Sequence, residues 1–239
     1  MDNDYFLELK MQEPILYKGI KIYQPTLEEI QHNFGLEKFY TILIPFVSTI
    51  DCFNFKTTKD IESIDLFSDI LCHIKEMNDN ICIALQFFFK KDCVRIIDDK
   101  IVVIENDKIT TILDRDDFYN IAKIIRLITA KKVIEIEKPP EGLSARKLDI
   151  WTKLHEGRKR DAERNAVHIY DVLNVCEFGG NFHIPMSEIK TWTLWTIMNC
   201  YNAVVGLRIY DNEFSKYLVN GDGKNISNDK YWHSVLMIH

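Results

Sequence analysis

One short stretch of the 239-residue chain carries side-chain types that could cut a phosphodiester. Asp98, Asp99 and Lys100 have the D-x-K spacing that metal-dependent nucleases can carry at the end of a strand. There, carboxylates would hold Mg²⁺ and the lysine would offset the charge of the transition state. The same three residues are typical of a hairpin turn, and no clear acidic partner precedes them. The sequence therefore favours a turn.

The glycines near the end of the chain suggest a phosphate-binding loop at first. A P-loop needs a glycine five residues before its Gly-Lys pair and a Ser or Thr directly after it, because its amides and hydroxyl hold phosphate and Mg²⁺. In the segment NGDGKNIS, which contains Gly223 and Lys224, those two positions are Leu218 and Asn225. We interpret this segment as a turn after a helix.

The histidines and cysteines lack the spacings of metal sites. None of the seven histidines forms H-x-x-x-H or H-E-x-x-H, and the chain has no C-x-x-C. The six cysteines lie in apolar runs such as SDILCHI, which favours inert core thiols over a nucleophile or a disulfide framework. We expect no cofactor, no metal and no catalytic residue. The acidic N-terminus, MDNDYFLELK, has no long apolar stretch, so we expect a reducing cytoplasm and no membrane.

A basic run is the best candidate for contact with a partner. The net charge of the chain is -6, so a nucleic-acid contact would have to use this short run. Asp161 and Glu163 lie among its cations, and no aromatic residue alternates with them. A solvated helix face or a protein partner is therefore favoured over nucleic acid. The cations are Arg158, Lys159, Arg160 and Arg164.

Aromatic residues near the C-terminus are the second candidate. Trp192, Trp195, Met198 and Tyr201 recur at helical spacing and share a face, which favours a core stripe, although Trp and Met are also enriched at interfaces. Two further large aromatics follow in the last ten residues and would be exposed unless they docked on the helix of this stripe. The partner-binding hypothesis includes Trp192, Trp195, Tyr231 and Trp232.

The elements that carry these residues indicate an α+β fold. We predict an α+β domain over residues 1–134, a linker rich in proline and charge over 135–145, and a helical domain over 146–239. The first domain contains a small antiparallel β-meander from Cys93 onward, because three β-branched runs are separated by turn residues.

Helix boundaries follow from capping residues. Thr26 with Glu29 forms a capping box, and Asp114 is the N-cap of the helix after the meander. We expect a break near Pro45 and one amphipathic helix over 59–78. We also expect one long helix that begins after Ser187 and ends at Asn220.

The order of several segments resembles a known family. ILYKGIKIYQPTLEEI near the start, KPPEGLSARK and RKRDAERN in the middle, and MSEIKTWTLWTIMNCYN near the end are similar to tail-module proteins, such as tail assembly chaperones, of phages infecting low-GC Gram-positive bacteria. The resemblance implies a non-enzymatic protein without catalytic residues that contacts other tail proteins, such as the tape measure or tube protein, and that can form a homo-oligomer. It implies action in the host bacterial cytoplasm, with or without incorporation in the virion.

Two other functional classes stay open. A phage nucleic-acid-binding or nuclease-like accessory protein would rest on Asp98 to Lys100 and on the basic run at 158–164. An enzyme of another kind would use a cysteine or an acidic site. Retention on DNA that falls steeply with salt would separate the first of these from a protein-assembly role.

Overall fold

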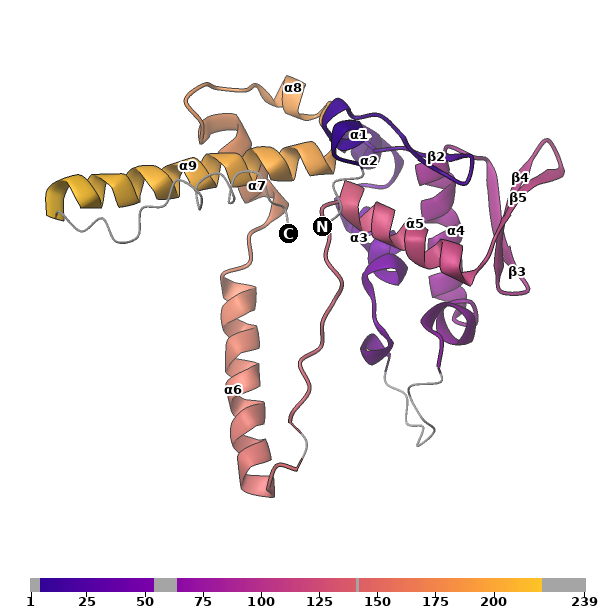
Figure 1. Cartoon of the computed structure of the whole chain (residues 1–239), viewed down its shortest axis with the longest axis horizontal. Coiled ribbons are helices and arrows are strands. Elements are labelled where there is room, and N and C mark those ends of the chain that lie inside the picture. The colour runs from indigo at the N-terminus through magenta and orange to yellow at the C-terminus, as the bar shows by residue number, and fades with distance from the viewer. Residues whose placement is uncertain (1–4, 54–63, 141, 221–239) are drawn as a thin grey trace.

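The fold is α+β, as predicted, with two small antiparallel sheets and several helices in the N-terminal part and a helical C-terminal part (Figure 1). The computed structural model describes residues 5–53, 64–140 and 142–220.

The chain begins with α1 (Phe6–Met11) and a tight hairpin of β1 (Ile15–Tyr17) and β2 (Ile20–Ile22). The turn residues Lys18 and Gly19 both have positive φ, at 46° and 82°, which a two-residue hairpin turn of this kind requires.

Two helices follow, and the second differs from its prediction. In α2 (Leu27–Asn33), the Thr26 side chain accepts a hydrogen bond from the Glu29 amide, and the Glu29 carboxylate accepts one from the Thr26 amide, so the capping box is confirmed. The expected break near Pro45 is wrong, since α3 (Leu36–Val47) continues through it. The proline ring is buried, and its packing in the core offsets the hydrogen bond that it cannot donate.

The single amphipathic helix expected over 59–78 is also wrong. After η2 (Ile50–Cys52), the described part of that stretch forms a π-helical turn, η4 (Leu66–Leu71), and Ile74 is extended before α4 (Lys75–Phe89) begins. Tertiary contacts override the helical pattern. The Phe67 ring stacks on Phe118 with centroids 4.4 Å apart, and the Tyr119 hydroxyl accepts a hydrogen bond from the Phe67 amide. Residues 59–63 of that stretch lie outside the described residues.

The predicted meander is confirmed. It consists of β3 (Cys93–Ile97), β4 (Lys100–Glu105) and β5 (Lys108–Leu113) in sequential antiparallel order. It leads into α5 (Arg115–Ile128), where Asp114 and Asp117 form a capping box around the N-terminus. Together with α3 and α4, these elements enclose a main core rich in phenylalanine, whose fully buried members include Phe39, Phe46, Phe67, Phe88 and Phe118.

The C-terminal part contains α6 (Ala145–Arg164), α7 (Ile169–Phe178), α8 (Met186–Ile189) and α9 (Leu194–Asn220). The single helix expected from Ser187 is therefore wrong, because α8 ends at Ile189 and a new helix starts at Leu194. Thr193 is the reason, since its hydroxyl accepts a hydrogen bond from the Thr196 amide and so caps α9.

The segment between α8 and α9 packs on the N-terminal part. The amides of Leu27 and Glu28, in the first turn of α2, donate to the carbonyls of Trp192 and Lys190, both over 2.9 Å. Leu194 and Trp195 belong to the main core, while Leu27 belongs to a second apolar cluster with α7, α8 and α9. Hydrophobic contacts thus join the regions before and after the predicted linker at 135–145. The division into domains stays a prediction.

Candidate interaction surface

The helix α6 is the most exposed element of the molecule's described part. It has 20 residues and buries none of them, and it stands away from the rest of the chain in Figure 1. Its composition explains this exposure, because charged and polar residues occupy most of its circumference. Ser144 occupies the N-cap position of α6, without a capping hydrogen bond from its side chain.

One face of α6 lies against an extended segment, which we call the strap (residues 131–140). Glu137 of the strap contacts two residues of α6, with a carboxylate oxygen 3.2 Å from Nδ1 of His155 and the other 3.2 Å from a guanidinium nitrogen of Arg158. Trp151, one turn before His155, stacks on its ring at 4.8 Å. These contacts join one side of α6 to the strap.

The strap in turn is attached to the N-terminal part. The Ile134 amide donates to the Val47 carbonyl over 2.7 Å, and the Thr49 hydroxyl donates to the Ile134 carbonyl. Lys138 forms an ion pair with Asp51. Because the strap contains no helix or strand, these few bonds hold it in place.

The structure separates the four predicted cations of α6. Arg158 faces the strap and pairs with Glu137, and Arg164 pairs with Asp161 at 3.8 Å. Among the described residues, Lys159 and Arg160 have no ion pair. Successive residues of a helix point about 100° apart, so the run is not one basic patch.

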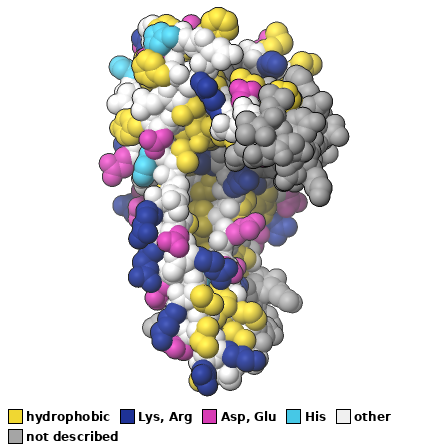
Figure 2. All heavy atoms as spheres, turned by 90° about the vertical axis from the view of Figure 1, so that its left-hand side faces the viewer, with side chains coloured by type: hydrophobic (Ala, Val, Ile, Leu, Met, Phe, Trp, Pro, Cys, Tyr) yellow, Lys and Arg dark blue, Asp and Glu magenta, His cyan; other side chains and the backbone are white. Residues whose placement is uncertain are grey.

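Spacing along α6 creates a different surface, which the sequence analysis missed. Three cations recur every seven residues, and three acids recur every seven residues between them, so that the charge alternates along one side of the helix. All six side chains are exposed. Figure 2 shows basic and acidic side chains interspersed along this projecting part. The charged stripe consists of Arg146, Asp149, Lys153, Glu156, Arg160 and Glu163.

Apolar side chains on other sides of α6 also meet solvent. Leu148 and Leu154 are 42% and 61% exposed, respectively, and Ile150 beside the stripe is 49% exposed. Exposed apolar side chains grouped on one element are more informative than scattered ones, since a partner can bury them.

In contrast to the residues of α6, the predicted contact residues Trp192 and Trp195 are partly or fully buried. Trp195 is 6% exposed within the main core, where its ring meets Phe6 edge-on at 6.1 Å. Trp192 is half-buried against the second apolar cluster. The aromatic stripe that begins at Trp192 and includes Trp195 therefore packs in the core, and Trp195 is not accessible to a partner. Tyr231 and Trp232 lie outside the described residues, so their docking stays a prediction.

The D-x-K segment forms a turn. Asp98 and Asp99 occupy the left-handed region, with φ of 48° and 55°, between β3 and β4. Burial raises the pKa of the nearby Cys72 thiol to about 12, with a contribution from the Asp99 carboxylate. In the described ranges, no three His, Cys, Asp or Glu side chains are placed to hold a metal ion.

Comparison of the chain with protein-family models, with curated proteins and with solved structures gives no match. Within residues 5–53, 64–140 and 142–220, no helix combines the length and the apolar character that a membrane span needs.

Proposed function

We propose that this protein is a non-enzymatic bacteriophage tail assembly protein, acting as a chaperone or as a tail component, which works through contacts with other proteins. The observation that supports the proposal best is α6, a helix of 20 residues with no buried side chain. The resemblance of segment order to phage tail-module proteins supplies the biological setting.

Helix α6 lacks the packing that stabilises most helices. Most helices in proteins gain their stability from packing of an apolar face and not from helix propensity alone. On α6, Leu148 and Leu154 remain exposed on either side of the part that meets the strap. A partner that covers them would remove apolar surface from water and would stabilise the helix at the same time.

The proposed partner is another tail protein, such as the tape measure or tube protein. Cations and apolar side chains lie together on α6, with Lys147 and Lys159 near Leu148 and Leu154 in the helical projection. A partner segment with apolar residues flanked by acids would fit this arrangement. Action in the host cytoplasm, before or during tail assembly, is part of the proposal.

The experiment is a binding measurement with the purified tape measure and tube proteins of the same phage. The double variant Leu148→Ser, Leu154→Ser should weaken the complex by tenfold or more, on the order expected for two apolar interface residues. Its melting temperature should stay within about 2 °C of the unsubstituted protein, because both residues are exposed.

The matched control is Ile109→Ser, Ile112→Ser on β5, two apolar residues that are 59% and 57% exposed. This variant should bind normally. The proposal fails if the α6 variant binds as tightly as the unsubstituted protein. It also fails if both double variants lose the same affinity, because α6 would then not be the contact surface. Retention on DNA that falls steeply between low and high salt would support a nucleic-acid role instead.

A further inference from the structure

We propose that the charged stripe of α6 is a surface for self-association, on which α6 of a second copy of this chain packs in antiparallel orientation. The proposal is independent of the tail-assembly role and rests on the spacing, exposure and sign of the six charges.

The spacing places all six charges on one side of α6. Arg146, Lys153 and Arg160 are seven residues apart, as are Asp149, Glu156 and Glu163. The steps between neighbours alternate between three and four residues, which is the pattern of the contact positions in paired helices. The stripe covers about 100° of the helix circumference.

For two helices in register, the order of signs matches an antiparallel partner and not a parallel one. From Arg146 to Glu163 the charges alternate, beginning with a cation and ending with an acid. When the sequence is reversed on a second helix, every cation meets an acid. In a parallel pair in register, each residue would meet its own copy, and like charges would repel. The facing pairs are Arg146 with Glu163, Asp149 with Arg160, and Lys153 with Glu156, each formed twice by the two-fold symmetry.

Within the described part of the chain, the stripe is accessible for this contact. Glu137 of the strap holds His155 and Arg158, which lie on the side of α6 opposite the stripe. Within the stripe, Lys153 and Asp149 form an ion pair of 2.8 Å, in which both side chains stay more than 60% exposed. The six side chains therefore remain accessible to a second molecule.

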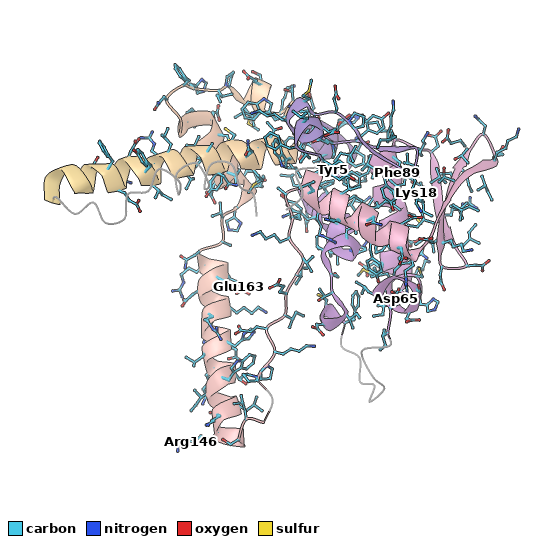
Figure 3. The ribbon with its side chains drawn as sticks, in the orientation of Figure 1. Tyr5, Lys18, Asp65, Phe89, Arg146 and Glu163 are labelled. Carbon is cyan, nitrogen blue, oxygen red and sulfur yellow. The ribbon has the colours of Figure 1, made fainter. Side chains whose placement is uncertain are left out.

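The shape of the molecule allows the pairing. Arg146 and Glu163, labelled in Figure 3, mark the two ends of α6; α7 and α9 lie beyond the Glu163 end, and the strap runs alongside the helix. An antiparallel pair puts the two bodies at opposite ends of a contact about 30 Å long. Ile150 borders the stripe and would lie beside Gly157 of the second copy, where an added Cβ would meet nothing within 4 Å of its own chain.

The test is sedimentation of the full chain at low and high salt. We expect a dimer at about 50 mM salt that dissociates towards about 0.5 M, because exposed charges are screened. The variant Glu163→Arg should weaken the dimer about tenfold, since it opposes Arg146 of the second copy at two symmetric places.

Two double variants separate contact between molecules from contact within the helix. Arg146→Glu, Glu163→Arg exchanges charges that are 17 positions apart, and it should restore the dimer because these residues face each other only across two copies. Arg160→Glu, Glu163→Arg exchanges neighbours within one helix and should remain monomeric, since it puts like charges against Asp149 and Arg146 of the second copy. A monomer at all salt concentrations, an unchanged Glu163→Arg dimer, or equal behaviour of the two double variants would overturn the proposal.

Discussion

At the scale of single residues, Asp117 is a buried carboxylate with three polar partners. It is 3% exposed at the N-terminus of α5, and its carboxylate accepts hydrogen bonds from the Tyr17 hydroxyl and the Asp114 amide. The Lys18 ammonium lies 2.7 Å from the same carboxylate. Asp117 thus caps its own helix and joins α5 to the β1–β2 hairpin, which is 100 residues earlier.

The first prediction concerns this carboxylate. Desolvation alone would raise the pKa of Asp117, but the bonds from Lys18, Tyr17 and Asp114 outweigh it and lower the pKa below the ordinary value of 3.8. Asp117→Asn should reduce the free energy of unfolding by about 1–3 kcal/mol at pH 7, because the charge-assisted bonds are lost. Urea denaturation measures this difference.

The contribution of the Asp117 carboxylate to stability should depend on pH. A carboxyl group whose pKa is lowered by folding contributes stability above its unfolded pKa, and the contribution disappears as the pH falls through the folded pKa. The difference between Asp117→Asn and the unsubstituted protein should therefore shrink below about pH 4. Asp116→Asn, whose side chain is 77% exposed in the same turn, serves as the control and should change stability little. A constant difference from pH 7 to pH 3 would contradict the linkage argument.

At the scale of elements, the strap and α6 form a pair without a core of their own. The strap has no regular structure, and α6 buries no residue. Their mutual contacts are the hydrogen-bond contact of Glu137 with His155 and the exposed ion pair of Glu137 with Arg158, and such surface contacts contribute little to stability. This part of the chain should open before any other described element.

The second prediction follows from that weakness. Limited digestion with trypsin should cut first between residues 135 and 147, and the Arg146 bond is the expected site because the Lys138–Pro139 bond resists trypsin. Mass spectrometry of early fragments would identify residues 1–146 and 147–239. Early cuts between residues 64 and 130 would show instead that the N-terminal part opens first.

At the scale of the whole molecule, the start of α9 holds the two halves together. Trp195 and Leu194 are buried among residues of the N-terminal part, and Lys190 forms an ion pair of 2.7 Å with Glu28. The bonds from the α2 amides to the segment before α9 add to this junction. The described chain is thus one connected structure across the strap.

The third prediction tests the junction. Protein cut once by trypsin should elute from gel filtration as the intact chain does, because the buried contacts of Trp195 survive the cut. Trp195→Ala should lower the free energy of unfolding by about 3–5 kcal/mol and should release the fragments after cutting. Trp151→Ala on α6, a half-buried residue, is the control and should leave the cut protein associated. Fragments that separate without denaturant would favour two independent domains.

Much of the local structure could be predicted because its causes lie within a few residues of each other. The predicted helix caps at Thr26 and Asp114 are confirmed. Each cap depends on hydrogen bonds with a residue only three positions later in the chain. The meander was predictable from its alternation of β-branched runs and turn residues, and the solvation of α6 from its composition.

The sequence by itself also contained the charged stripe, since seven-residue spacing is visible without a structure. Adjacency along the chain indicated instead a basic run from Arg158 to Arg164. Adjacency misleads on a helix, where neighbours point in different directions. Only the structure shows that the strap covers the opposite side of α6 and leaves the stripe exposed.

Tertiary packing decided the features that local patterns mispredicted. The stacking of Phe67 on Phe118 accompanies a π-helical turn where a regular helix was expected, and burial of Pro45 keeps α3 continuous. For Trp195 the spacing correctly favoured a core position, but only the structure shows that residues more than 150 positions earlier, such as Phe6, cover it. A sequence pattern reports which face of an element is apolar, but the partner of that face depends on long-range contacts that spacing along the chain does not encode.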